Sequence, residues 1–312
     1  MVLLLVQVVV MVALTPLLVG VMRQVRSRLE GRAGAGILQP WRDLRKLFAK
    51  EPLRAPGISW VQAAGPVVLV TSGLLLCALI PLVGTVASPL LTDDLFVVVG
   101  VLLVGTVALA LVGLDAGSAF GGMGSSRHMT IAALVEPTVL VAVYALSVPI
   151  GSSALSRIVN ARIEAPASVA APVSLLAMVA LAIAVMAETS RMPVDNPSTH
   201  LELTMVHEAM VLESSGRDLA WLELGSWLRL GALLGLIGTL TLPWGMAVEV
   251  APVPVLVGVV TLAVRLAVLG ALLATLEVFL AKLRLFRVPE LLAGSFVLAL
   301  LAVTASYLTV TV

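Results

Sequence analysis

A densely charged passage separates two long apolar stretches of this chain. It begins Glu188-Thr-Ser-Arg191-Met-Pro193-Val-Asp195-Asn-Pro-Ser-Thr-His200-Leu-Glu202, and further ionisable residues follow, namely His207, Glu208, Glu213, Arg217 and Asp218. Carboxylates and imidazoles can transfer protons or bind metal ions, and arginine can hold an anionic group in a fixed orientation. Residues 188–218 are therefore the first candidate for a functional region.

The prolines of this passage predict a break in the backbone. Pro193 and Pro197 rule out one continuous helix from the preceding apolar stretch, because proline lacks the N–H that a helix interior requires. We expect the break between Pro193 and Ser198, with Ser198 or Thr199 capping a new helix.

The ionisable side chains of this predicted helix lie on different faces. Glu202 and Glu213 share one face, His200 and His207 lie on roughly the opposite face, and Glu208 lies between them. Metal binding is the less favoured interpretation, because the two histidines are seven residues apart and no His-Glu-x-x-His motif is present. A partner-facing surface on one side and buried carboxylates on the other explain the same residues.

Ionisable residues also occur inside the apolar stretches, where each is costly and marks a functional pathway by default. They are Glu136, Glu223, Arg229, Arg265 and Glu277. We expect Arg229 and Arg265 near mid-membrane on neighbouring antiparallel helices, in one polar interior with Glu136. Two interpretations stay open, a structural ion-pair network and a proton-relay or charge-coupling track.

The glycine-rich segment Gly117–His128 resembles a phosphate-binding loop only superficially. No strand is predicted before it and no Gly-Lys-Ser/Thr follows, so nucleotide binding is not supported. We interpret its glycines as sites of close helix packing and as part of a flexible loop. Arg127 is the candidate partner nearest in sequence to Glu136. A later small-residue face also predicts close helix approach, at Gly231, Gly235 and Gly238.

The composition of the chain indicates which elements must position these residues. Apolar residues make up 60% and charged residues 12% of its 312 residues, which excludes a soluble fold and predicts an all-α polytopic membrane protein. A helix needs roughly 20 apolar residues to cross the hydrocarbon layer. Eight such spans are predicted within one transmembrane domain, residues 1–312: Val2–Met22, Val61–Thr85, Leu95–Leu114, Met129–Ile150, Ser168–Ala187, Leu219–Pro243, Pro252–Leu276 and Leu291–Thr311.

Positive charge is distributed unevenly between the loops. Lys and Arg in short loops are retained in the cytoplasm, and most of them fall in the first, third, fifth and seventh loops, whereas the other side has only Arg157 and Arg162. Both termini are therefore predicted outside the cytoplasm, and the charged loop and helix of residues 188–218 inside it.

The first loop, residues 23–60, is predicted to contain a short amphipathic helix on the cytoplasmic side. Trp41, Leu44, Leu47 and Phe48 fall on one face at helical spacing. The charged residues of the same segment are Arg42, Asp43, Arg45 and Lys46, with the three cations largely on the other face. The helix is either an interfacial element held by anionic lipid or the rim of a portal where a lipid-like carrier or a peripheral subunit docks.

Several classes of function are disfavoured. The single cysteine, Cys77, lies in an apolar run, so the chain alone builds neither a disulfide nor a cysteine-ligated cluster, and any redox centre is expected in a partner. A net charge of +1 argues against nucleic-acid binding. The first apolar stretch lacks the charged flank and cleavage site of a secretory signal and is expected to be a retained span.

The passage from Ala187 to Leu219 resembles the signature of the complex I subunit 1 family. More narrowly, it resembles the membrane-anchor subunit of group 4 membrane-bound [NiFe]-hydrogenases, also called formate hydrogenlyase subunit 4. Two further segments look like family motifs in the expected order, Gln39-Pro-Trp-Arg-Asp-Leu44 and Gly124-Ser-Ser-Arg127 with Glu136-Pro137. The resemblance covers essentially the whole chain.

The chain departs from the quinone-reducing branch of that family. That branch has Phe before the aspartate and Glu-Tyr further on, whereas this chain has Val194 before Asp195 and Glu213-Ser-Ser-Gly216. The resemblance therefore implies the hydrogenase branch. It implies a subunit without its own redox centre that anchors a [NiFe] large subunit and an iron–sulfur small subunit on the cytoplasmic side. It also implies antiporter-like neighbours in a bacterial or archaeal cell membrane.

We predict a coupling role in which charge changes in a docked arm perturb this chain and, through it, neighbouring ion-translocating subunits. The predicted coupling residues are Glu136, Glu188, Arg191, Asp195, Glu202, Glu208, Glu213, Arg229 and Arg265. The predicted docking residues are Arg42, Asp43, Arg45, Lys46, Arg127, His200, His207, Arg217 and Asp218. No catalytic residue or metal ligand is predicted.

Three alternatives are weighed against this role. The first is a quinone-site subunit of a complex I-type oxidoreductase, whose chamber the basic first loop would border. The second is an independent transporter, which is disfavoured because the proline break lies at the predicted membrane boundary and no inverted repeat is evident. The third is a purely structural anchor.

Overall fold

The computed structural model describes residues 2–54, 57–86, 92–195, 205–281, 283 and 287–311. Within these ranges the regular structure is helical, and pairing between extended segments is limited to the isolated bridges Gly84–Ala247 and Asp94–Ala154. The prediction of an all-α fold is confirmed.

Seven helices of the described part are long and apolar enough to cross a membrane. They are α1 (Val2–Leu29), α3 (Val61–Leu79), α4 (Leu95–Asp115), α5 (Ala119–Ser147), α9 (Gly216–Thr241), α10 (Pro252–Phe279) and α11 (Val288–Thr311). The shorter apolar helix α7 (Pro172–Glu188) has 17 residues. These eight helices correspond in order to the eight predicted spans. The shorter elements are α2 (Gln39–Phe48), η1 (Val148–Ile150), α6 (Leu155–Glu164), η2 (Pro166–Ala170) and α8 (His207–Val211).

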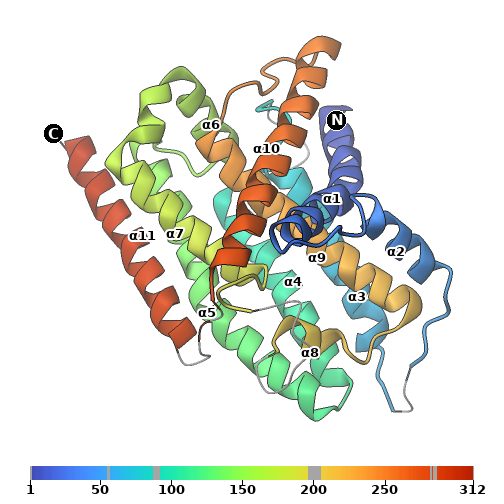
Figure 1. Ribbon diagram of the computed structural model, residues 1–312. Helices are drawn as coiled ribbons and strands as arrows, with labels where there is room; N and C mark the ends of the chain where they lie inside the picture. The colour runs from blue at the N-terminus through green and yellow to red at the C-terminus, as the bar shows by residue number, and fades with distance from the viewer. Residues whose placement is uncertain are drawn as a thin grey trace.

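Helix α9 is the centre of the bundle. It packs against α1, α3 and α10, and 83% of its most apolar window is buried, compared with 28% in α10 and in α11. Its glycines permit this close contact, as predicted: Gly231 lies against Thr15 of α1, and Gly235 against Leu82. Figure 1 shows α11 at one edge of the bundle beside α7, and α2 at the opposite edge.

The glycine-rich segment is helical, which corrects the prediction of a flexible loop. Helix α5 begins at Ala119, ten residues before the predicted span, and the Ser118 side chain caps it by accepting the N–H of Gly121. The glycines are packing sites, because a side chain at Gly121 would meet the carbonyl of Gly113, and one at Gly124 would lie 2.9 Å from Ala209. Close packing thus favours the helix over the conformational freedom of glycine.

The break after α7 is confirmed, but it begins earlier than predicted. Helix α7 ends at Glu188, and Ser190 adopts a positive φ of 50°. The predicted helix through Glu213 is wrong in its described part, because α8 covers only His207–Val211. The predicted caps Ser198 and Thr199 lie outside the described residues.

Candidate coupling site

A buried ion pair joins the end of α7 to the middle of α9. Glu188 Oε1 accepts a hydrogen bond from Arg229 Nη2, and the two side chains are only 2% and 7% exposed. Removing one partner of such a pair leaves an uncompensated charge and costs about 3–5 kcal/mol. The protonation of Glu188 and the position of Arg229 are therefore strongly linked.

Helix α4 forms the platform that holds this pair. Arg229 Nη2 also donates to Thr106 Oγ1 at 2.8 Å and to the Leu102 carbonyl at 3.3 Å. The Thr106 hydroxyl lies 3.3 Å from Glu188 Oε1 and 3.0 Å from the Leu102 carbonyl. Gly105 leaves room for the guanidinium, since a Cβ there would lie 3.1 Å from Arg229 Nη1. Arg229 is thus fixed by one carboxylate, one hydroxyl and one carbonyl.

Glu136 lies beside this cluster on α5. Its carboxyl group interacts with Thr106 and lies within electrostatic range of Glu188 and Arg229. The residue is 8% exposed, and its buried Oε1 has no hydrogen-bond partner among the described residues. The structure therefore brings Glu136, Glu188 and Arg229 together, as the sequence predicted for Glu136 and Arg229.

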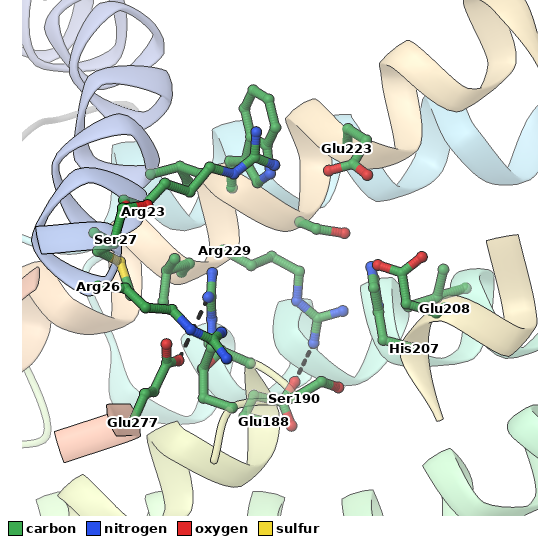
Figure 2. A pocket seen from close by; sticks show the side chains of 18 of the residues that line it. Arg23, Arg26, Ser27, Glu188, Ser190, His207, Glu208, Glu223, Arg229 and Glu277 are labelled. Atoms are coloured by element: carbon green, nitrogen blue, oxygen red, sulfur yellow. Dashed lines mark hydrogen bonds and ion pairs between the residues drawn. The ribbon is translucent and has the colours of Figure 1, made fainter. Parts of the chain in front are cut away.

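A polar cavity of about 400 Å³ opens beside the cluster. Its lining comes largely from α1, α7, α9 and α10. The charge pattern predicts that this side of the bundle faces the cytoplasm. Its charged lining consists of four carboxylates and five guanidinium groups, namely Glu188, Glu208, Glu223, Glu277, Arg23, Arg26, Arg32, Arg191 and Arg229. Figure 2 shows Glu223, His207 and Glu208 on one side of this space and Glu277 on the other, with Arg229 and Glu188 between them.

A second ion pair closes the side of the cavity formed by α10. Arg191 Nη1 lies 3.5 Å from Glu277 Oε1, and the two side chains are 17% and 3% exposed. Burial lowers the pKa of Arg191, and the attraction of Glu277 opposes that shift. Arg191 thus belongs to the cavity, and its partner is a carboxylate that the sequence did not assign to the site.

Asp195 positions the histidine of the cavity wall. Its Oδ2 accepts the backbone N–H groups of Val206 and His207, each at 3.2 Å, so it caps the start of α8 from eleven residues upstream. Burial lowers the pKa of the His207 side chain, and Glu223 and Asp195 oppose that shift. His207, which the sequence predicted as a docking residue, is half-buried and lines the cavity.

Three predicted coupling residues, and the predicted docking residue Arg127, are not placed in the cluster. Arg265 donates to the Trp244 carbonyl, which follows the end of α9, and it is not among the residues that line the cavity. It therefore does not share one polar interior with Glu136. Arg127 donates to the Met205 carbonyl at 3.2 Å and not to Glu136. Glu213 is exposed beyond the end of α8. Glu202 lies outside the described residues.

The predicted docking residues divide between exposed and paired side chains. Helix α2 forms as predicted, and Arg42, Arg45 and Lys46 are exposed on it. Asp43 lies 3.4 Å from Arg23 of α1. The remaining predicted docking residues are placed as follows: Asp218 binds Arg54 at 2.8 and 3.1 Å, Arg217 is exposed, and His200 lies outside the described residues.

Sequence reasoning missed the α4 platform. Thr106 is the only hydroxyl or ionisable residue between Leu95 and Leu114. A single polar residue in an apolar span was the one feature of the sequence that could have indicated this contact. Glu223 and Glu277 were noted as charges within spans but were not assigned to a site, because the approach of α9 and α10 to the cavity depends on tertiary packing. In the part of the chain that the structure describes, no group of three or more His, Cys, Asp or Glu side chains could hold a metal ion.

Comparison with known proteins identifies the family to which this chain belongs. The family model described as NADH dehydrogenase matches residues 1–308. The chain belongs to the NADH dehydrogenase family. This match confirms the resemblance to complex I subunit 1 that the charged passage carries.

Two proteins from Escherichia coli K12 are similar to this chain. Formate hydrogenlyase subunit 4 is 31% identical over 299 residues, which cover 96% of each chain. Hydrogenase-4 component C is 34% identical over 245 residues, covering 78% of this chain and 76% of that protein. These similarities confirm the resemblance to the formate hydrogenlyase branch.

A solved structure shows the same fold. A chain of the membrane-bound sulfane sulfur reductase, an archaeal respiratory membrane complex, matches with a TM-score of 0.85 and 17% sequence identity. The match covers 98% of this chain and 98% of that chain. The arrangement of helices is therefore shared with a chain of a respiratory membrane complex, and this chain is a multi-pass membrane protein.

Proposed function

We propose that this chain is the membrane-anchor and coupling subunit of a membrane-bound hydrogenase complex. The observation that carries the proposal is the buried cluster of Glu188, Arg229 and Thr106, which lies at the wall of an open polar cavity. The names of the two E. coli relatives support the hydrogenase assignment. Ion movement would be driven through charge and not through a reaction catalysed by this chain.

In this proposal a soluble arm docks over the cavity mouth. The arm would contain a [NiFe] large subunit and an iron–sulfur small subunit, and antiporter-like subunits would lie beside the bundle in a bacterial or archaeal cell membrane. The exposed cations Lys46 and Arg217 would supply part of the docking surface. Arg23, Arg26 and Arg32 at the cavity would face the same arm.

Electrostatics can connect the arm to the cluster. Two unit charges about 4 Å apart interact by about 4 kcal/mol at an effective dielectric constant near 20, which corresponds to about three pKa units. A change of charge at the cavity would thus shift the balance between the Arg191–Glu277 pair and the Glu188–Arg229 pair. Glu136, which lies next to Glu188, would pass this shift to neighbouring subunits.

A quinone-site subunit of a complex I-type oxidoreductase is the second candidate. The cavity itself favours it, because His207 and Arg191 supply hydrogen-bond donors in a space of about 400 Å³. This candidate requires a quinone to occupy the cavity during turnover.

Purification of the intact complex distinguishes the two candidates. The chain would be isolated from its native membrane in mild detergent, its partners identified by mass spectrometry, and the sample assayed for nickel and for hydrogen-dependent dye reduction. A [NiFe] subunit with hydrogenase activity supports the proposal. Partners without nickel, together with bound quinone and sensitivity to quinone-site inhibitors, would replace it with the second candidate.

A further inference from the structure

An apolar groove runs beside α2 and shares no lining residue with the polar cavity. Its volume is about 480 Å³. It is lined by Val12 of α1, Leu224 of α9 and six residues at and before α2, namely Leu38, Trp41, Arg42, Leu44, Arg45 and Phe48. Six of these eight residues are apolar, so the groove favours a hydrocarbon chain over water.

Two guanidinium groups stand at this apolar groove. Arg42 and Arg45 are three residues apart on α2 and therefore neighbours on its surface. Both are exposed, and neither side chain has a hydrogen bond or ion pair with another described residue. Arg23 and Arg26 differ in this respect, since Arg23 is paired with Asp43, and Arg26 with Glu30. The groove thus combines an apolar wall with two cations that are available to an anion.

The surroundings of the groove match the boundary between lipid tails and headgroups. The large apolar side chains of Ile37, Leu38 and Trp41 are 45%, 56% and 38% exposed beside these cations. Exposed apolar and aromatic residues next to arginine are expected where a helix lies in the membrane interface. Residues 23–54 contain nine basic and three acidic residues, a net charge of +6, which attracts anionic lipid to this surface.

We propose that the groove binds one anionic phospholipid. An acyl chain lies against Val12, Leu44 and Leu224, and Arg42 and Arg45 hold the phosphate. Arginine suits this role because its planar guanidinium donates paired hydrogen bonds to phosphate oxygens. A neutral lipid would leave both cations without a partner. The site is a structural lipid site of this chain and goes beyond the proposed coupling function.

The test counts phospholipids that remain bound to the purified complex. Wild type and variants are washed in detergent and analysed by mass spectrometry, and binding of dioleoylphosphatidylglycerol and dioleoylphosphatidylcholine is then titrated. The variant Arg42→Gln/Arg45→Gln removes the phosphate contacts. The matched control Lys46→Gln/Lys50→Gln removes the same charge from the same region outside the groove. Leu224→Trp fills the groove and leaves its charge unchanged.

Wild type is expected to retain one phosphatidylglycerol and to prefer it over phosphatidylcholine. Each arginine lost weakens phosphatidylglycerol binding about fivefold, the lysine control retains the lipid, and Leu224→Trp lowers retention of both lipids. An equal loss of phosphatidylglycerol in the lysine control would show that the lipid is held by diffuse attraction to the basic surface, and it would overturn the proposed site. Unchanged retention in the double arginine variant, or a quinone or protein segment occupying the groove in the complex, would overturn it as well.

Discussion

The substitution Gly105→Ala tests the platform that holds Arg229. A Cβ at this position would lie 2.5 Å from Ser72 Oγ, 3.1 Å from Arg229 Nη1 and 3.4 Å from Arg229 Cζ. Real Cβ atoms do not approach within 3.0 Å of such neighbours, so Ser72 must move and the Arg229 guanidinium must give way. Arg229 has little freedom, because Glu188 and Thr106 hold it.

The magnitude follows from three contributions. Overpacking a filled interior costs about 1–3 kcal/mol, and rotating Ser72 breaks its 2.8 Å bond to the Leu69 carbonyl, which contributes about 1 kcal/mol. Alanine in place of glycine in a helix contributes about 1 kcal/mol in the opposite direction. Gly100→Ala on the same helix is the matched control, since a Cβ there meets nothing within 4 Å. The gain in helix propensity is the same in both variants and cancels when they are compared. Gly105→Ala is therefore expected to have an unfolding free energy about 2–4 kcal/mol lower than that of Gly100→Ala.

The assay compares the unfolding free energies of both variants in mixed micelles, together with ion translocation by the assembled complex. Gly105→Ala is expected to be less stable than Gly100→Ala and to lower ion translocation per electron. Adding Ser72→Ala should recover the part of the stability lost to the Ser72 contact but not the coupling, because the Arg229 contact remains. Equal unfolding free energies and equal ion translocation per electron in Gly105→Ala and Gly100→Ala would refute the claim that α4 holds Arg229 in place.

Other expected outcomes concern neighbouring residues. Thr106→Val removes the hydroxyl between Arg229 and Glu188 at nearly constant volume and should cost about 1–3 kcal/mol of unfolding free energy, whereas Thr71→Val, at an exposed position of α3, should cost little. Asp195→Ala should increase amide hydrogen exchange at Val206 and His207, and unchanged exchange there would contradict the capping role. Burial lowers the pKa of His207 from its ordinary value of 6.5. Just below pH 6.5 the unfolded chain therefore binds a proton at His207 more readily than the folded chain does. Stability should therefore fall as the pH drops below about 6.5, and His207→Gln should make that fall shallower.

Much of the bundle could be predicted from the sequence because its apolar stretches are long. Seven of the predicted spans form helices long and apolar enough to cross a membrane, and the fifth forms the shorter helix α7. The amphipathic helix α2 follows from the spacing of Trp41, Leu44 and Phe48. Helix α5 shows where such reasoning fails. Its glycines suggested a loop when considered locally, but Gly121 and Gly124 allow close contact with Gly113 and Ala209, and only the folded neighbours supply that stabilisation.

The candidate site was predicted in its residue types more than in its contacts. Glu136 and Arg229 could be selected because ionisable groups inside spans are rare, and Glu188 because it begins the charged passage. Their partners depend on how helices are rotated against one another, which sequence spacing does not determine. Arg265 therefore lies apart at the Trp244 carbonyl, whereas Thr106, a neutral residue of an apolar helix, lies at the centre of the cluster.

The membrane orientation, the docking surface and the coupling role stay predictions. The family model and the two hydrogenase-related relatives establish the kind of protein. The geometry adds one continuous arrangement, from the Arg191–Glu277 pair through the polar cavity to the Glu188–Arg229 pair and Glu136.

The most direct test of coupling measures ions moved per electron transferred by the purified complex in sealed vesicles, with Glu188→Gln in this chain. Glu164→Gln is the matched control, since Glu164 is also the last residue of a helix but is exposed. We predict that Glu188→Gln retains assembly and electron transfer to dye but loses ion translocation, and that the control retains all three. An unchanged ratio of ions to electrons in Glu188→Gln would contradict the proposed coupling role.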